Sequence, residues 1–207
     1  MSSIIKWAAV AASVMSLSGF VASNASAAVT VFGDDHAQAC YQAAKNNLNR
    51  QTDLDECSQA INFGLLQSKD LAGTYVNRGA VYMTMQAWPQ AEADFHHALE
   101  LQPNFGEALV NLGAAQIGLH RNQEGVDTIS RGLAIGSMEP EKAYFNRALG
   151  YEALGDDKAA YFDYLKASQL APKWAQPREE LVRFTVHQQY ARTAGATRLD
   201  HPHPAPG

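Results

Sequence analysis

Two cysteines and seven histidines are the residues of this chain with the most distinctive chemistry. His96 and His97 are adjacent, so on a helix their side chains point about 100° apart and cannot share a metal as an i, i+4 pair does. His201 and His203 flank a proline in a short tail and would hold copper or nickel only weakly. No Ser-His-Asp order, glycine-rich phosphate loop or carboxylate pair is evident. The sequence therefore predicts no enzyme, no metal site and no cofactor.

The two cysteines, Cys40 and Cys57, are separated by 17 residues. A redox-active or metal-binding pair usually has Cys-x-x-Cys spacing or further Cys and His ligands, and His36 is the only candidate ligand nearby. In an exported protein, an even number of cysteines is typical of a structural disulfide. The turn-like residues 46–53 suit two antiparallel helices with one cysteine on each. The sequence thus favours a disulfide that closes a helical hairpin.

Three asparagines, Asn77, Asn111 and Asn146, recur at intervals of 34 and 35 residues. An asparagine side chain carries both a donor and an acceptor, so it can bond both polar groups of a peptide backbone. Repeated once per structural unit, such a row can hold an extended chain with little dependence on its side chains. The alternative is that each asparagine bonds the neighbouring unit and fixes how the units stack. The sequence leaves both roles open.

The asparagines belong to a pattern that occurs three times. Small residues follow them at Gly79, Gly113 and Ala148, and large residues occupy Phe95, Ile129 and Tyr164. A large residue on one helix that meets a small one on the next allows close packing, and a period near 34 is typical of stacked helix–turn–helix units. Over Ala72–Pro172 the pattern resembles the tetratricopeptide repeat (TPR) family. The resemblance implies an all-α right-handed solenoid that binds other proteins.

We therefore expect an all-α fold of several parts: a degenerate N-terminal hairpin (34–67), three TPR-like repeats (72–105, 106–140 and 141–174), a C-terminal capping helix (175–192) and a disordered tail (193–207). Asp34 and Asp35 are expected to cap the first helix, and Asp53 with Glu56 is expected to start the second as a capping box. The segments Cys40-Tyr41-Gln42-Ala43-Ala44 and Glu56-Cys57 resemble exported bacterial TPR proteins. That closer resemblance implies no activity.

The resemblance also implies that the first helix of each repeat lines a concave groove. The residues expected to bind a peptide there are Val76, Asn77, Ala80, Asn111, Ala114, Lys142, Phe145 and Asn146. Some members of the family bind C-terminal carboxylates with lysines and an arginine, but this chain has Val76, Ala80 and Asn146 at those positions, and only Lys142 is cationic. Arg78 and Arg147 are expected to run along the seam between helices with their guanidinium groups in solvent.

The N-terminus has the features of a secretory signal peptide. Lys6 is the only charged residue before Asp34, an apolar run covers 7–21, and Ala25-Ser26-Ala27 is a small-x-small cleavage site. We expect removal of residues 1–27, with cleavage after Ala27. The alternative is a membrane anchor, but about 15 residues interrupted by Ser and Gly fall short of the roughly 20 that a span needs. In a Gram-negative bacterium the product would be a soluble periplasmic protein.

The charge pattern narrows the kinds of partner. The formal net charge is −5, and lysines and arginines form no cluster, so neither nucleic acid nor an anionic membrane is an expected partner. We expect an exported scaffold that binds a protein or an extended peptide through the apolar groove and its asparagines. The alternative is a homo-oligomeric self-association module, in which the groove or an uncovered end of the solenoid pairs with a second copy.

Overall fold

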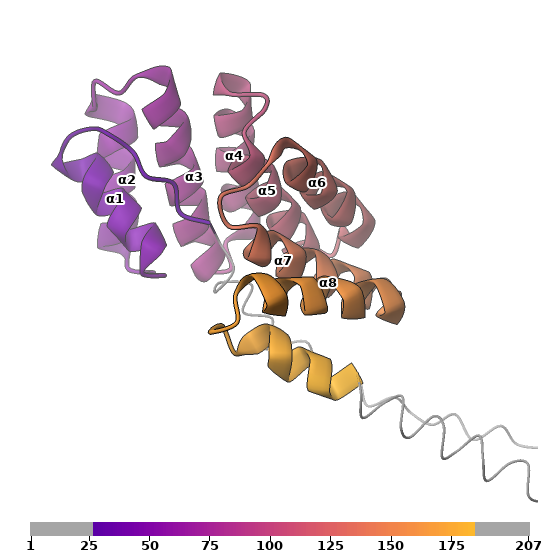
Figure 1. The fold of residues 1–207 in the computed structure, drawn as a ribbon. Coiled ribbons are helices and arrows are strands. Elements are labelled where there is room, and N and C mark those ends of the chain that lie inside the picture. Colours follow the sequence, from indigo (N-terminus) through magenta and orange to yellow (C-terminus); the bar gives the residue numbers. More distant parts are fainter. Residues whose placement is uncertain (1–26, 185–207) are drawn as a thin grey trace, which may run out of the picture.

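The computed structural model describes residues 27–184, and within that range every regular element is a helix (Figure 1). The helices are α1 (Asp35–Lys45), α2 (Gln51–Phe63), α3 (Ser68–Thr84), α4 (Trp88–Leu101), α5 (Gly106–Gly118), α6 (Asn122–Ile135), α7 (Pro140–Ala153) and α8 (Asp157–Leu170), and a further helix covers 176–184. Residues 1–26 and 185–207 lie outside the described residues. They contain the expected signal peptide up to Ser26, the end of the expected capping helix and the expected tail.

The helices form successive hairpins that stack side by side. In each hairpin the two helices pack on one another, and each hairpin also packs on the next: α2 contacts α3, α4 contacts α5, and α6 contacts α7. The first helices of the repeats, α3, α5 and α7, are also in contact along the stack. None of the helices within 27–184 is long and apolar enough to cross a membrane.

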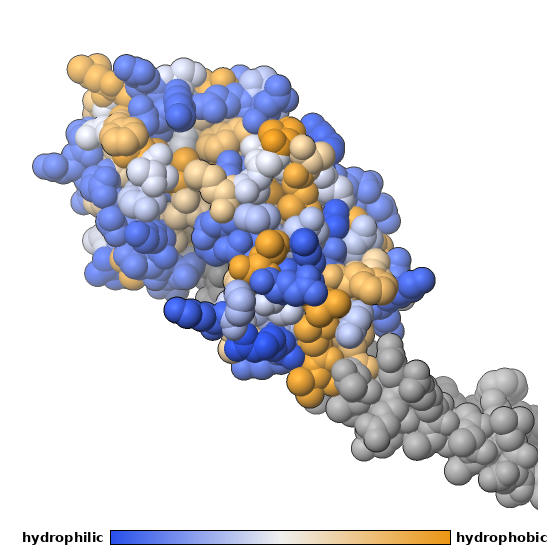
Figure 2. Space-filling model, in the orientation of Figure 1, coloured by the Kyte–Doolittle hydropathy of each residue, from blue (hydrophilic) through white to orange (hydrophobic). Residues whose placement is uncertain are grey.

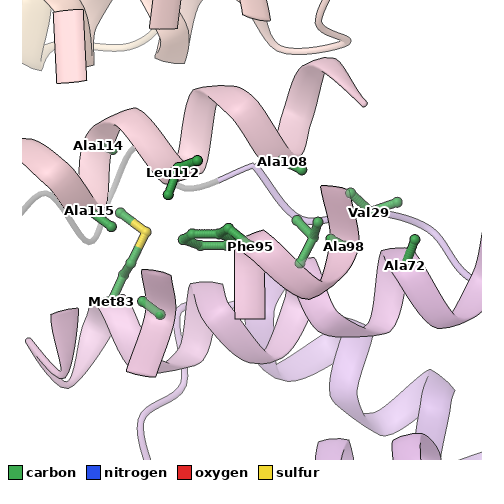
Figure 3. Close-up of a cluster of buried hydrophobic side chains, with 11 residues drawn as sticks. Val29, Ala72, Met83, Phe95, Ala98, Ala108, Leu112, Ala114 and Ala115 are labelled. Atoms are coloured by element: carbon green, nitrogen blue, oxygen red, sulfur yellow. The ribbon is translucent and has the colours of Figure 1, made fainter. Parts of the chain in front are cut away.

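Small residues on the first helix of a hairpin make room for large ones on the second. A Cβ atom placed on Gly79 would lie 2.5 Å from the Phe95 ring, and one on Gly113 would lie 2.5 Å from Ile129 Cγ1. Phe95 is fully buried, and Figure 3 shows its ring among Met83, Leu112 and other side chains from neighbouring helices. In the first two repeats the large/small alternation of the sequence therefore corresponds to helix contacts that leave no room for a Cβ atom on the small residue.

The N-terminal hairpin consists of α1 and α2, which Cys40 and Cys57 join through a disulfide with a Cα–Cα distance of 4.6 Å. The Asp34 side chain caps α1 by accepting the Ala37 N–H at 2.9 Å. The second helix begins earlier than the sequence predicts. Arg50 is its N-cap and donates its backbone N–H to Asp53 Oδ2 at 2.8 Å, so Asp53 lies inside the first turn. The carboxylate still satisfies a free backbone donor of the helix start, but from the third helical position.

Aromatic side chains cover the other end of the stack. Trp174 and the helix 176–184 follow α8 and pack on α7 and α8. The Trp174 ring lies 4.8 Å from Phe145, and Phe184 lies 5.9 Å from Tyr164. Tyr164 is fully buried. These contacts give the last repeat the apolar neighbour that each earlier repeat finds in the next hairpin.

Candidate peptide-binding site

The three asparagines occupy equivalent positions on stacked helices. Asn77 lies on α3, Asn111 on α5 and Asn146 on α7, and all three side chains are buried. We call the sides of α3, α5 and α7 that carry them the asparagine face. A buried side-chain amide has to satisfy its donors and its acceptor within the protein or with bound water. The partners of these amides therefore define what the face recognises.

The chain's own N-terminal segment (residues 27–33) provides partners for two of the asparagines. Val29 donates its N–H to Asn77 Oδ1 at 2.7 Å, and Asn77 Nδ2 donates to the Val29 carbonyl at 2.8 Å. Ala27 makes the same pair with Asn111, at 3.2 Å to Oδ1 and 3.0 Å from Nδ2. Figure 1 shows this segment, in indigo, crossing α3 before it enters α1. Each asparagine thus bonds both polar backbone groups of one residue of a peptide.

The two residues that the asparagines hold are alternate residues of the N-terminal segment. The side chains of Ala27, Val29 and Val31 are buried, whereas Thr30 and Phe32 are exposed. This alternation is what an extended chain shows when one side of it lies against a surface. One repeat of the solenoid therefore corresponds to two residues of the bound segment.

Two residues of α3 that the sequence did not indicate shape the surface under the segment. A Cβ atom on Gly73 would lie 2.7 Å from Val31 Cγ1 and 3.2 Å from Val29 Cγ1, so the segment lies directly on the helix backbone. The Asp70 carboxylate accepts the Phe32 N–H at 2.9 Å. A signal for Gly73 exists in the repeat alignment, because the equivalent positions of the other two repeats carry long charged side chains.

The apolar residues expected in the groove are distributed among several clusters. Val76 and Ala114 belong to the cluster that also contains Val29, so they lie in the core beneath the N-terminal segment. Figure 3 shows Ala114 and Val29 on different sides of the Phe95 ring. Ala80 lies in the cluster around Cys40. All of these side chains are buried, so they pack beneath the asparagine face and do not form an open binding surface.

Phe145 and Lys142 differ from the expectation. Phe145 packs against Tyr164 and Trp174 in the core at the C-terminal end, because the chain after α8 folds back over α7. The equivalent positions of the first two repeats, Val76 and Val110, pack toward the following repeat. In the last repeat this position packs against Trp174 and the helix 176–184. Lys142 lies in the first turn of α7, where its ammonium group pairs with Glu139 at 2.8 Å.

The two arginines that follow the asparagines are not in solvent, contrary to the expectation. Arg78 makes a bidentate pair with Asp94, with distances of 2.8 and 2.7 Å, and Arg147 makes one with Asp163 at 2.7 and 2.9 Å. A third polar partner is Ser58 for Arg78 and Ser130 for Arg147. These pairs join the two helices of a hairpin and also reach the preceding hairpin.

Tyrosine rings flank both guanidinium groups. The Arg147 guanidinium carbon lies 5.4 Å from the Tyr144 ring centre and 5.7 Å from that of Tyr151. The hydrogen bonds to Asp163 raise the pKa of Arg147 above its ordinary value, and burial opposes that effect. In the first repeat, burial raises the pKa of Asp94 despite the charge of its arginine partner. A planar, permanently charged group held in this way fixes the seam of the hairpin and is withdrawn from any ligand.

Metal ligation has no evident place in this part of the chain. Among residues 27–184, no group of three or more His, Cys, Asp or Glu side chains is positioned to hold a metal ion. The charged side chains at the C-terminal end form an ion-pair network in which Arg183 binds Glu152 and Glu180. Glu152 also accepts the Tyr164 hydroxyl at 3.0 Å, and burial followed by the charge of Glu152 raises the pKa of that tyrosine.

Comparison with solved structures identifies the fold. No protein-family model and no curated protein matches the chain. The TPR domain of Arabidopsis OM64 superimposes with a TM-score of 0.53 at 21% identity, covering 58% of this chain and 99% of that one. The first TPR of Spaghetti (RPAP3), bound to the HSP90 peptide SRMEEVD, gives 0.53 at 18% identity, covering 58% and 95%.

A longer match comes from a bacterial protein. MamA (41-end) of Desulfovibrio magneticus RS-1 gives a TM-score of 0.55 at 18% identity, covering 79% of this chain and 91% of that chain. At such identities the likeness concerns the fold alone. It confirms the predicted fold class: the chain is an all-α solenoid of TPR-like repeats.

Proposed function

We propose that this protein is an exported scaffold that binds another protein by holding an extended segment of it on the asparagine face. The observation that carries the proposal is the pair of hydrogen bonds that Asn77 makes with Val29, repeated by Asn111 with Ala27. Neither amide bonds an adjacent repeat in these contacts. Both bond the backbone of an extended peptide, and that peptide happens to belong to the same chain.

The geometry specifies the kind of peptide. Recognition through N–H and C=O groups is independent of side chains, so the sequence of the ligand matters only where its side chains face the solenoid. In this structure those positions hold Ala27, Val29 and Val31. The valine side chains lie so close to the backbone of Gly73 that larger side chains would not fit there. We therefore infer a ligand with small or β-branched residues at every second position, bound in extended form with the exposed positions unrestricted.

The comparison with RPAP3 supports the proposal, since that TPR domain is bound to the peptide SRMEEVD. Of the cationic side chains that would recognise an acidic C-terminus, Lys142 is the one present at the expected positions on α3, α5 and α7, and its ammonium group pairs with Glu139. The arginines at positions 78 and 147 are engaged by Asp94 and Asp163. The proposed ligand is accordingly an internal or terminal segment without a required carboxylate.

Self-association is a second candidate, favoured by one surface feature. Phe32, Phe63 and Leu65 are exposed by 81%, 75% and 103%. Their segments lie close together, because a Cβ atom on Gly33 would lie 2.5 Å from Leu66 Cδ2. Figure 2 shows apolar side chains gathered at the opposite end as well, over α8 and the helix that follows it. Light scattering at micromolar concentration separates the candidates: a stable dimer that Phe63→Ser abolishes would favour self-association over a foreign ligand.

The test of peptide binding uses the N-terminal segment itself as the probe. A fluorescein-labelled peptide Ala-Ala-Val-Thr-Val-Phe-Gly, with the sequence of residues 27–33, is titrated against the full chain and followed by anisotropy. In the unaltered protein the attached segment competes at an effective concentration in the millimolar range. Val31→Asp places a charge against Gly73, loosens the attached segment and should strengthen binding of the probe by about tenfold or more.

A matched control distinguishes release of the segment from a general effect of charge. Thr30→Asp adds the same charge at an exposed position of the same segment and should leave probe binding unchanged. In the Val31→Asp background, Asn111→Ala should reduce probe affinity by roughly tenfold, as expected for loss of a hydrogen-bonded pair. If the Val31→Asp protein is folded and the probe does not bind it, the asparagine face is not a peptide site.

A further inference from the structure

The residue that fills the Asn111 position is the last residue of the expected signal peptide. Ala27 supplies both the N–H that Asn111 Oδ1 accepts and the carbonyl that Asn111 Nδ2 donates to. It is also the third residue of the cleavage site Ala25-Ser26-Ala27. Cleavage after Ala27 therefore removes both hydrogen-bonding partners of Asn111 at once, whereas Val29, the partner of Asn77, stays in the chain.

We propose that removal of the signal peptide opens the backbone-binding position at Asn111, and that this position in the mature protein takes the backbone of an extended peptide from another protein. This inference rests on the proposed function and adds where the ligand binds and when the position becomes available. Residues 28–33 remain on the Asn77 side of the face and close that end of it. The incoming peptide thus enters from the side of α5 and α7.

The burial at Asn111 defines the chemistry of the ligand. The Asn111 side chain is fully buried and Ala27 is 1% exposed, so the position accommodates a methyl group and little more. After cleavage, water occupies the place of the Ala27 backbone. An incoming N–H and C=O replace that water with the paired hydrogen bonds seen here. The residue opposite Asn111 should therefore be alanine, glycine or serine, with unrestricted residues on either side.

The same burial sets the order of events. Hydrogen bonds on both sides hold the bond between Ala27 and Ala28 against the solenoid. Ala27 bonds Asn111 before it, and Val29 bonds Asn77 after it. A peptidase requires its substrate in an accessible, extended form, so the folded precursor hides the bond between Ala27 and Ala28. Cleavage must precede folding, and a precursor that folds first keeps the Asn111 position filled.

The test compares the full chain with the mature chain that begins at Ala28. The probe is the labelled, C-terminally amidated peptide Val-Ala-Ser-Asn-Ala-Ser-Ala, which has the sequence of residues 21–27. The mature chain should bind this peptide about tenfold or more tightly than the full chain does, because only there is Asn111 open. Asn111→Ala in the mature chain should remove the gain, and a probe ending in Leu should bind more weakly than the one ending in Ala.

Two results would overturn the inference: equal binding by both chains, or an Asn111→Ala variant that is folded by circular dichroism and binds as the parent does. Asn111→Ser replaces the alanine variant if the latter does not fold. The outcome is separable from that of the proposed function. If the Val31→Asp protein binds the 27–33 peptide but the mature chain shows no gain for the 21–27 peptide, only the opening at Asn111 is refuted. If neither peptide binds, both are refuted.

Discussion

Asn77 and Val29 form a closed pair in which one side-chain amide bonds both the N–H and the carbonyl of one residue, at 2.7 and 2.8 Å. The two residues are 48 positions apart, and both are buried. The pair shows how a helical surface can hold a strand-like peptide without a β-sheet. The same pair recurs at Asn111 and Ala27, so two successive repeats each hold one residue of the segment.

Gly73 provides a selective way to displace the N-terminal segment. Gly73→Ala would place a methyl group 2.7 Å from Val31 Cγ1, while in a helix interior alanine is favoured over glycine by about 1 kcal/mol. We therefore expect α3 to persist and the segment to leave its position. Amide hydrogen exchange at Val29 should become at least tenfold faster, with the melting temperature nearly unchanged.

Gly79→Ala is the matched control for that substitution. Its methyl group would meet the Phe95 ring instead of the segment, which should cost about 1–3 kcal/mol of overpacking and lower the melting temperature. The double substitution Gly73→Ala with Val31→Ala should restore protection at Val29. Unchanged exchange in Gly73→Ala would show that the segment does not rest on this part of α3.

The disulfide between Cys40 and Cys57 should be present in the protein purified from its native compartment. Closing a loop of this size contributes about 3 kcal/mol in the chain-entropy description. Mass measurement without reductant should find no thiol that reacts with an alkylating agent, and two reactive thiols would contradict the pairing. Reduction should accelerate hydrogen exchange in α1 and α2 far more than in α7 and α8, because each hairpin depends mainly on its neighbours.

Loss of the buried pair of Arg147 and Asp163 should lower the free energy of unfolding more than loss of an exposed pair does. Arg147→Met leaves the Asp163 carboxylate buried without its partner, which should cost about 3–5 kcal/mol in denaturant unfolding. Arg121→Met, which removes an exposed arginine that pairs with Glu92 and Glu124, should cost at most about 1 kcal/mol. Equal losses in the two variants would show that the buried pair adds nothing specific to the hairpin.

The exposed pair of His36 and Glu56 predicts a small pH dependence in the N-terminal hairpin. The ring of His36 donates a hydrogen bond from Nδ1 to Glu56 Oε2 at 2.6 Å, and this bond raises the pKa of His36 above 6.5. A raised pKa in the folded state means that the pair stabilises the hairpin below pH 6.5 and loses this effect as the pH rises through the folded value. An NMR titration should give a higher His36 pKa in the unaltered protein than in the Glu56→Gln variant. In that variant the His36 pKa should return toward 6.5.

The register of the repeats could be predicted from sequence because it depends on local spacing. The steps of 34 and 35 residues place Asn77, Asn111 and Asn146 on equivalent helices, and the small and large residues at Gly79 and Phe95 meet as their alternation predicts. Such contacts join residues close in the chain, so the pattern that encodes them is visible within one or two repeats.

The occupant of the asparagine face could not be predicted in this way. Ala27 and Asn111 are 84 residues apart, and no periodicity connects an extended segment to the helices that it crosses. Its alternation of buried and exposed residues covers only a few positions beside the expected cleavage site. The burial of the arginines has a signal in the sequence, because Asp94 and Asp163 each follow their arginine by 16 residues in two of the three repeats.

Recognition of the peptide backbone by the asparagines can be tested by changing the backbone of the ligand. A version of the 27–33 peptide with an ester in place of the amide at its first valine lacks the N–H that Asn77 accepts. Binding is measured to the Val31→Asp protein with and without Asn77→Ala. We expect the ester to weaken binding by roughly tenfold when Asn77 is present and to have little effect when Asn77 is replaced by alanine. An equal loss in both proteins would contradict backbone recognition by Asn77.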